Sequence, residues 1–329
     1  MTSQKYKHLM ICGFPSGGTD LTKSILNAHP NIDLCGELPL LTTIKNNGYF
    51  AETTFSNLAD IEKLRETLKN IDVWKNLKNI DYNFSEDLKD AKELSLEEVI
   101  RKLSSNHADT LIWGNKTPQN TEKMLEIQAL FPDVYFLIVT RDVREICLSW
   151  KNKWGRNSLT CANRWNARMS RGWKISKQLD AKRILFIKFE DLLNETEQSS
   201  RKICRFLSLP FSPRMLEHYK YIDANIDGKI NYGQPIKRGN FEKWRDHLSL
   251  KKIKRIEEIA WDSMQLLGYS PKYSTNSKPI SKLEKFLGYI HDAYAFIAIG
   301  NRAKSNNSFL SRLSATGIEI KKQIISRSR

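Results

Sequence analysis

The sequence predicts a three-layer α/β/α fold, in which helices cover both faces of a central parallel sheet. Apolar runs of strand length recur at 7–12, 32–35, 110–113, 134–140 and 183–189. Helical patterns separate these runs. The run 134–139 lacks polar alternation, which is typical of a strand buried on both faces. Alternating strands and helices indicate a parallel sheet that binds its ligand at the carboxyl ends of the strands.

The first predicted strand runs into a glycine-rich loop, Gly13 to Gly18, and then into a helical pattern. Leu21, Ile25 and Leu26 share one face of that helix. A strand that turns through glycines into a helix N-terminus directs backbone N–H groups and a positive dipole end at one place. The loop therefore predicts a phosphate or sulfate site, with an ordinary tight turn as the alternative.

The loop is P-loop-like without being a standard P-loop. Gly13 and Gly18 fit the spacing G-x-x-x-x-G, but Thr19 and Asp20 stand where a P-loop carries Lys and Ser or Thr. The lysine would contact the nucleotide phosphates and the hydroxyl would contact Mg²⁺. Their absence counts against an ATPase, a GTPase or a P-loop kinase.

Helix signals follow along the chain. Thr117 and Pro118 fit the N-cap and first position of a helix that reaches Leu130. Ser95 and Glu98 fit a capping box. The stretch 45–105 is polar and mostly helical, so we expect a helical insertion at about 45–110. Such insertions often determine which substrate is accepted.

The composition changes near residue 270. We therefore expect one domain over 1–270, with the insertion at about 45–110, and a basic, helical C-terminal extension over 271–329. The extension holds 11 Lys and Arg against 3 Asp and Glu. Its apolar segment 283–299 predicts a helix, which either packs on the domain or contacts a membrane surface or a partner.

Charge and cysteine content limit the partners and the compartment. The formal net charge of +16 predicts an anionic partner. No recognisable nucleic-acid-binding module is present, so we expect no nucleic acid partner. The five cysteines form no disulfide framework, which favours a reducing, cytoplasmic location, with membrane association as an open alternative. The six histidines lack metal-ligand spacing, so we expect no metal.

Four motifs follow one another in the chain. They are GFPSGGT at 13–19, IVTRD at 138–142 with a serine at 149, KFEDLL at 188–193, and IKRG at 236–239 followed by KWR at 243–245. In this order they resemble the sulfotransferases that use 3′-phosphoadenosine 5′-phosphosulfate (PAPS), above all those acting on carbohydrate or on protein tyrosine. The resemblance covers residues 8–270.

The resemblance implies transfer of a sulfuryl group from PAPS to a hydroxyl of a glycan, a glycolipid or a similar acceptor, with adenosine 3′,5′-bisphosphate (PAP) as the product. The 5′-phosphosulfate loop would comprise Pro15, Ser16, Gly17, Gly18, Thr19 and Asp20. Arg141 and Ser149 would hold the 3′-phosphate through charge-assisted hydrogen bonds. The segment that closes over the nucleotide would comprise Lys237, Arg238 and Gly239.

Two further residues follow strands and are predicted to act in the reaction. Glu37, after the second strand, matches the position of the family's glutamate base, so we expect a general base there. Lys116, in WGNKTP, resembles the family's W-G-x-K-[TD]-P and would bind substrate or the sulfonate. The alternatives are a helix-start carboxylate for Glu37 and a surface lysine for Lys116. Because side chains supply the positive charge, no metal is required.

The loop departs from the family pattern at three positions. Ser16 replaces a Lys or Arg, Gly17 replaces a Ser, and Asp20, which would face an anionic ligand, replaces the second Thr. Lys23, one turn into the helix, or Lys116 could supply the missing charge. The alternative is a protein of the same fold with weak or lost catalysis that only binds nucleotide or glycan. Restoring all three family residues would separate these interpretations.

Overall fold

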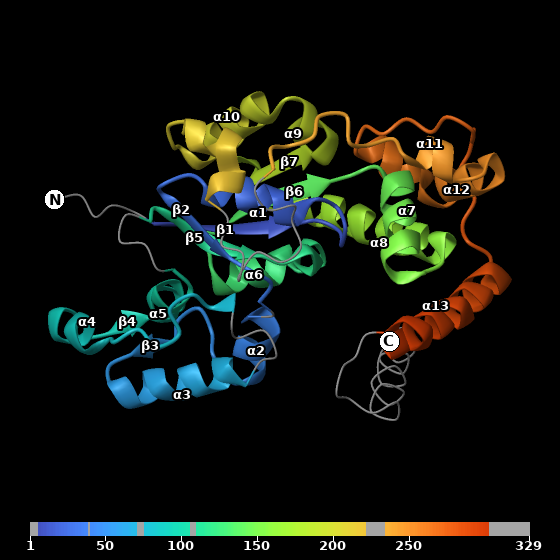
Figure 1. Cartoon of the computed structure of the whole chain (residues 1–329). Helices are drawn as coiled ribbons and strands as arrows, with labels where there is room; N and C mark the ends of the chain where they lie inside the picture. The colour runs from blue at the N-terminus through green and yellow to red at the C-terminus, as the bar shows by residue number, and fades with distance from the viewer. Residues whose placement is uncertain (1–5, 39, 71–75, 106–109, 222–233, 303–329) are drawn as a thin grey trace. The chain divides into compact units, whose positions relative to one another are not determined.

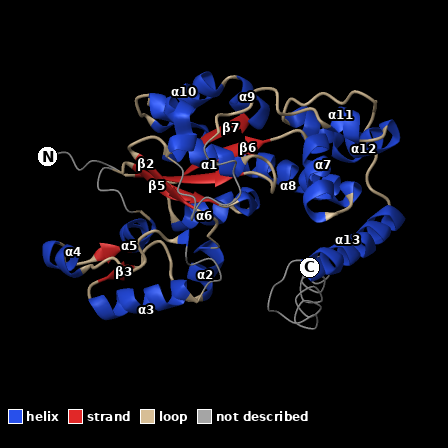
Figure 2. Cartoon of the chain, viewed as in Figure 1, coloured by secondary structure: helices blue, strands red, loops and turns tan. Residues whose placement is uncertain are grey.

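A five-stranded parallel sheet forms the centre of the fold (Figures 1 and 2). The strands are β1 (Lys7–Cys12), β2 (Ile32–Cys35), β5 (Ile112–Lys116), β6 (Tyr135–Thr140) and β7 (Ile184–Lys188). Their spatial order is β2-β5-β1-β6-β7, and every neighbouring pair is parallel. The loop after the central strand β1 therefore emerges in the middle of the carboxyl edge of the sheet.

All five predicted strands are confirmed, and one is displaced along the chain. The third was expected at 110–113, whereas β5 runs from Ile112 to Lys116. The residue at the carboxyl end of β5 is therefore Lys116 itself, which lies opposite Ile11 of β1 in the sheet register.

The computed structural model describes residues 6–38, 40–70, 76–105, 110–221 and 234–302. By its internal packing the chain forms two compact units. Unit 1 comprises Met1–Arg141 and Arg168–Phe241, and unit 2 comprises Asp142–Ala167 and Glu242–Arg329. The two units are defined by how closely residues pack, and this does not test where one domain ends. The expected division of the chain near residue 270 therefore stays a prediction.

Helices cover both faces of the sheet in unit 1, which confirms the predicted three-layer α/β architecture. Strand side chains alternate between two hydrophobic clusters: Met10, Trp113 and Ile138 belong to one, and Leu9, Ile112 and Val139 to the other. The first cluster includes residues of α3 (Leu58–Lys69), α5 (Leu96–Ser104) and α6 (Met124–Leu130). The second includes residues of α1 (Thr19–Asn27), α9 (Phe189–Asn194) and α10 (Thr196–Leu207).

The predicted insertion folds mainly as helices. It contains α3, α5, the end of α2 (Leu40–Asn46), α4 (Ser85–Asp90), and a small antiparallel pair formed by β3 (Thr54–Phe55) and β4 (Leu94–Ser95). The capping box at the start of α5 is confirmed. The Ser95 hydroxyl accepts the Glu98 backbone N–H, and the Glu98 carboxylate accepts the Ser95 N–H. Within 45–110, residues 71–75 and 106–109 lie outside the described residues.

The helix predicted from Thr117 to Leu130 is confirmed at its start and its end but is not continuous. A 3₁₀ helix, η2 (Pro118–Glu122), comes first, and α6 begins at Met124. Thr117 is the N-cap residue of η2 and Pro118 its first residue, as predicted, but the Thr117 side chain makes no capping hydrogen bond. Its hydroxyl instead accepts the Leu38 backbone N–H at 3.1 Å, because the turn after β5 packs against the segment after β2. Two further 3₁₀ segments are η3 (Ala181–Arg183) and η4 (Pro213–Lys220).

Unit 2 consists of helices and their connections. The helices are α7 (Val143–Trp154), the first part of α8 (Ser158–Ser176), α11 (Trp244–His247), α12 (Leu250–Leu266) and α13 (Lys282–Arg302). The helix predicted at 283–299 is confirmed as α13. Among the described helices, none is long and apolar enough to cross a membrane. The rest of the basic extension, 303–329, lies outside the described residues.

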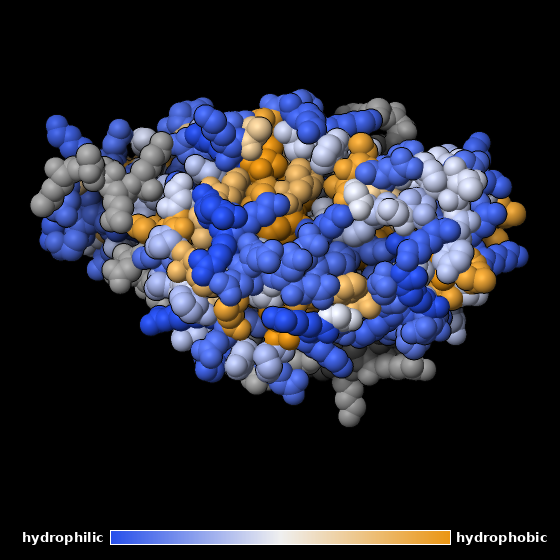
Figure 3. Space-filling view, turned by 90° about the horizontal axis from the view of Figure 1, so that it is seen from above, coloured by the Kyte–Doolittle hydropathy of each residue, from blue (hydrophilic) through white to orange (hydrophobic). Residues whose placement is uncertain are grey.

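Side-chain burial agrees with the composition. All five cysteines are buried with free thiols. Hydrophilic side chains predominate on the face shown in Figure 3, where apolar side chains form separate patches. Such a surface is expected of a chain with 53 Lys and Arg and 37 Asp and Glu.

Candidate functional site

The loop between β1 and α1 requires its glycines. A side chain at Gly18 would place its Cβ 2.0 Å from the Phe189 ring, and one at Gly17 would lie 2.6 Å from the Phe14 carbonyl oxygen. Gly18 also has a φ of +92°, in the left-handed region that favours glycine. The loop is therefore packed closely on both sides, and it leads directly into the N-terminus of α1.

The start of α1 and the loop leave polar groups for a ligand. Gly18 is the N-cap of α1 and provides no side-chain cap, so the first-turn N–H groups and the positive end of the helix dipole are not neutralised by it. The Ser16 hydroxyl oxygen is buried and finds no hydrogen-bond partner within the described part of the chain. A buried polar atom in that state calls for a polar ligand or water.

Lys116 lies between two carboxylates at the carboxyl edge of the sheet. Its Nζ is 2.6 Å from Asp20 Oδ1 and 2.8 Å from Glu37 Oε1. The Lys116 side chain is 6% exposed, whereas those of Asp20 and Glu37 are 58% and 45% exposed. The cation is therefore fixed inside the protein, and both carboxylates reach solvent. We call this trio the Lys116 cluster.

The two carboxylates keep Lys116 charged. Burial by itself would lower the pKa of Lys116, but attraction to the Asp20 and Glu37 carboxylates outweighs it and raises the pKa above its ordinary value of 10.5. Lys116 is therefore an ammonium at neutral pH. An ammonium so held can bind an anionic group at the edge of the cluster without changing its own protonation.

The three residues meet because their strands are neighbours in the sheet. Lys116 ends β5, which pairs with β1 on one side and with β2 on the other. Asp20 lies on the helix after β1, and Glu37 follows β2 by two residues. The Asn76 amide donates a 2.8 Å hydrogen bond to the Glu37 carbonyl and fixes the backbone there. Glu37 and Lys116 were predicted as site residues, and the structure brings them together.

Arg141 joins three of the predicted motifs. It follows β6, and its Nη1 donates a 2.9 Å hydrogen bond to the Ser16 carbonyl of the loop. Its guanidinium carbon lies 4.8 Å from the centre of the Phe189 ring. Phe189 belongs to the third motif and also contacts Gly18. The guanidinium is thus held between the first motif and the third.

The fourth motif is hydrogen-bonded to α9, the helix that carries most of the third motif. The Gly239 N–H donates a 3.1 Å hydrogen bond to the side-chain oxygen of Asn194, the last residue of α9. Lys237 and Arg238 are exposed, so they can meet a ligand from solvent. Pro15 and Thr19 lie within the loop and its helix as predicted, half-buried and buried.

The parts proposed for two further residues stay predictions. Lys23 is 1% exposed in the buried face of α1. Burial raises the pKa of the Cys35 thiol, and the charges of Lys78 and Lys23 oppose this effect. That Lys23 supplies the charge missing from the loop stays a prediction. Ser149 lies on α7 in unit 2, so its part in a phosphate site with Arg141 stays a prediction.

Two features were not foreseen from the sequence. Asp20 does not simply face a ligand, because its carboxylate pairs with Lys116. Thr121 holds the loop: its hydroxyl accepts the Gly13 N–H at 2.7 Å and lies within 2.9 Å of the Gly13 and Pro118 carbonyls. A threonine 108 residues away from its partner gives no local sequence signal. Within the described residues no group of three or more His, Cys, Asp or Glu could hold a metal ion.

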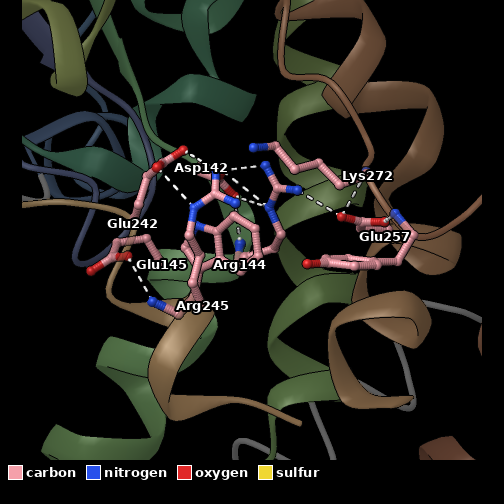
Figure 4. Close-up of polar contacts among 9 residues, drawn as sticks. Asp142, Arg144, Glu145, Glu242, Arg245, Glu257 and Lys272 are labelled. Atoms are coloured by element: carbon pink, nitrogen blue, oxygen red, sulfur yellow. Dashed lines mark hydrogen bonds and ion pairs between the residues drawn. The ribbon is translucent and has the colours of Figure 1, made fainter. Parts of the chain in front are cut away.

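A second polar cluster lies inside unit 2 and is drawn in Figure 4. Arg144 donates to both oxygens of Asp142 at 2.6–3.1 Å and to Glu257 at 2.6 Å. Glu257 is 0% exposed and also accepts backbone N–H groups of Lys272, Tyr273 and Ser274 at 2.7–3.0 Å. We call Asp142, Arg144 and Glu257 the Arg144 cluster. It ties α7, α12 and the segment 272–274 together.

Comparison with known proteins identifies related chains. The sequence model of the protein family described as "Sulfotransferase family" matches residues 8–213 of this chain. The chain is 22% identical over 283 residues to protein-tyrosine sulfotransferase A of Caenorhabditis elegans, covering 80% of this chain and 67% of that relative. It is 31% identical over 105 residues to human carbohydrate sulfotransferase 5, covering 29% of this chain and 25% of that relative.

A solved structure has a similar fold. The sulfotransferase domain of the Synechococcus PCC 7002 olefin synthase superimposes with a TM-score of 0.50 at 17% identity. The match covers 78% of this chain and 96% of that domain. At this identity the likeness concerns the fold alone. Together with the family match, it confirms the resemblance predicted from the four motifs.

Proposed function

The chain belongs to the sulfotransferase family, and we propose that it transfers a sulfuryl group from PAPS to a hydroxyl acceptor, with Lys116 and Glu37 at the reacting atoms. The observation that carries this proposal is the Lys116 cluster. A buried ammonium and a half-exposed carboxylate lie 2.8 Å apart, beside the loop that leads into α1. Sulfuryl transfer needs both a cation and a base at one place.

The groups around the loop fit the donor. PAPS carries a 5′-phosphosulfate and a 3′-phosphate, so it needs two anion-binding regions. The uncapped start of α1, the unpartnered Ser16 hydroxyl and the Lys116 ammonium fit the phosphosulfate. Arg141 and the exposed Lys237 and Arg238 supply positive charge for the remaining phosphate.

Each residue of the Lys116 cluster has a distinct part in the step. When bound, PAPS supplies the sulfuryl group: its bond to the bridging oxygen breaks, a bond to the acceptor oxygen forms, and PAP leaves. Glu37 accepts the acceptor proton, and its 45% exposure makes it reachable by an acceptor from solvent. Once Glu37 is neutral, Lys116 loses one of its two anionic partners. Its charge is then available to the oxygens of the transferred group.

The acceptor that we propose is a tyrosine hydroxyl of a protein. The tyrosine sulfotransferase relative matches along 80% of this chain, whereas the carbohydrate sulfotransferase relative matches along 29%. A glycan or glycolipid hydroxyl, expected from the sequence motifs, is the second candidate, since that shorter match has the higher identity of 31%. Glu37 serves as the base for either hydroxyl.

The proposal is tested by measuring PAP release and sulfate transfer with a tyrosine-containing acidic peptide and, separately, with an oligosaccharide. We expect turnover by the wild type and a ~10²–10⁴-fold lower kcat for Glu37→Gln, because the variant lacks the base. Glu126→Gln is the matched control. Glu126 is also about half-exposed and also pairs with a lysine, Lys45, at 3.6 Å, but it lies on α6.

The outcomes separate the parts of the proposal. If only the oligosaccharide is sulfated, the proposed acceptor changes from tyrosine to a glycan, while PAPS as donor and Glu37 as base still stand. Unchanged kcat in Glu37→Gln would remove Glu37 as the base. Wild-type protein that binds PAP but transfers to neither acceptor would overturn the proposed reaction.

A further inference from the structure

The outer face of α13 carries a row of exposed apolar side chains. Their exposed fractions range from 53% to 73%, unusual for so many large apolar groups on one helix. They are Leu283, Phe286, Leu287, Ile290 and Tyr294. Residues 283, 287, 290 and 294 follow one another at helical spacings of three and four, so they form one stripe along the helix, with Phe286 at its edge. We call these five residues the α13 stripe.

The opposite face of α13 holds the helix on unit 2. Gly288, Asp292 and Ala295 are buried there. A Cβ at Gly288 would lie 2.4 Å from a Thr160 methyl group, so the two elements are in close contact. The α13 stripe is therefore the face that packing inside unit 2 leaves uncovered in the described part of the chain.

Both acidic residues of α13 have hydrogen-bond partners within unit 2. The Glu284 carboxylate accepts two hydrogen bonds from Arg255 of α12 at 2.7 and 2.8 Å. The Asp292 carboxylate accepts the Asn157 backbone N–H at 2.7 Å and the Thr160 hydroxyl at 2.8 Å. The described part of α13 therefore presents no unpaired carboxylate next to the apolar stripe.

The surrounding charge is positive. Residues 271–329 hold 11 Lys and Arg against 3 Asp and Glu, a net charge of +8 by sequence. Lys282 lies in the first turn of α13 beside Phe286 of the stripe and is exposed. An apolar row next to a lysine, in a segment of net positive charge, is the combination that binds an anionic membrane surface.

We propose that the α13 stripe rests on the surface of an anionic lipid bilayer, with the apolar side chains at the acyl boundary and Lys282 at the headgroups. This proposal does not depend on the reaction proposed above. Apolar burial supplies part of the affinity, and attraction of the basic extension to anionic headgroups supplies the rest. A second copy of the chain fits this face less well, because docking it would bring two segments of +8 charge together.

The test is co-sedimentation of the full chain with vesicles of phosphatidylcholine alone and of phosphatidylcholine with phosphatidylserine. We expect the wild type to sediment with the anionic vesicles, and added salt to weaken this binding. The variant Leu287→Gln/Ile290→Gln/Tyr294→Gln should bind these vesicles at least ~10-fold more weakly, because three apolar contacts are lost.

The matched control is Leu250→Gln/Leu266→Gln/Tyr273→Gln. These three side chains are 64%, 42% and 43% exposed in the same unit but lie outside α13. The control should bind like the wild type. Circular dichroism and the midpoint of thermal unfolding show that both variants are folded. Equal binding of the α13 variant and the wild type would overturn the proposal, as would equal sedimentation of the wild type with neutral vesicles.

The same samples test the other occupant. Light scattering of the vesicle-free protein reports its oligomeric state. If the wild type does not bind the vesicles and forms a dimer, whereas the α13 variant is a monomer, the stripe is the contact surface for a second copy of the chain. If the wild type does not bind the vesicles and is a monomer, the proposal is also overturned.

Discussion

The Lys116 cluster and the Arg144 cluster share one composition, a buried cation between two carboxylates, and differ in what surrounds the carboxylates. Asp20 and Glu37 are about half-exposed and reach solvent. Asp142 and Glu257 are buried, and three backbone N–H groups also donate to Glu257. The first cluster has acceptor oxygens open to a ligand, whereas the polar atoms of the second are used within the protein.

The difference separates an arrangement that suits the proposed reaction from one that suits a structural role. A buried ion pair has already lost its hydration, so removing one partner leaves an uncompensated charge. A pair with exposed carboxylates loses little when one of them is removed, because water replaces the partner. Stability should therefore depend on the Arg144 cluster, and activity on the Lys116 cluster.

The largest expected effect is on the stability of Glu257→Gln. The amide cannot neutralise Arg144, and it accepts fewer of the hydrogen bonds at that position. We expect a loss of ~3–5 kcal/mol in the free energy of unfolding, against ~0–1 kcal/mol for Glu37→Gln. Urea denaturation followed by circular dichroism measures both. Similar losses in the two variants would mean that exposure does not distinguish the clusters.

The next effect concerns the rate. Lys116→Met keeps an unbranched side chain that is one atom shorter and removes its charge, so the developing negative charge loses a fixed cation. We expect kcat to fall by ~10²–10³. Lys78→Met is the control, since Lys78 is also a largely buried lysine paired with a carboxylate, that of Asp33, at a position outside the Lys116 cluster. The control should lose stability and retain kcat. A control that loses kcat equally would show that the loss follows from general destabilisation.

The features that follow from local sequence could be predicted, whereas contacts between distant residues could not. The strands were predictable from their apolar runs. The placement of Glu37, Lys116 and Arg141 at one edge of the sheet was predictable because each lies at or just after the end of a parallel strand. The pairing of Asp20 with Lys116 could not be predicted from the sequence, because it depends on the register of β1 against β5. The Arg144 cluster was missed as well. Its partners Asp142 and Glu257 are 115 residues apart, and no local spacing marks Glu257 as buried.

The structure also changes the experiment that the loop sequence suggests. A side chain at Gly17 would meet the Phe14 carbonyl at 2.6 Å, and Ser16 has a left-handed φ of +64°, which disfavours a larger side chain. Restoring Ser16→Arg, Gly17→Ser and Asp20→Thr together would therefore disturb the loop backbone. The informative change is Asp20→Thr alone, since Asp20 is exposed and contacts Lys116 through its carboxylate.

The effect expected of Asp20→Thr is a small change in affinity. The Asp20 carboxylate competes with an anionic donor for Lys116, and it is a negative charge next to the loop. Removing it at an exposed position is worth about 1 kcal/mol, so we expect PAP to bind ~5-fold more tightly in an equilibrium titration. Asp81→Thr is the control, because Asp81 is an exposed carboxylate paired with Lys69 at 2.9 Å. Weaker binding by Asp20→Thr would mean that the carboxylate itself helps to hold the donor, and that Lys116 is not the cation for which the two anions compete.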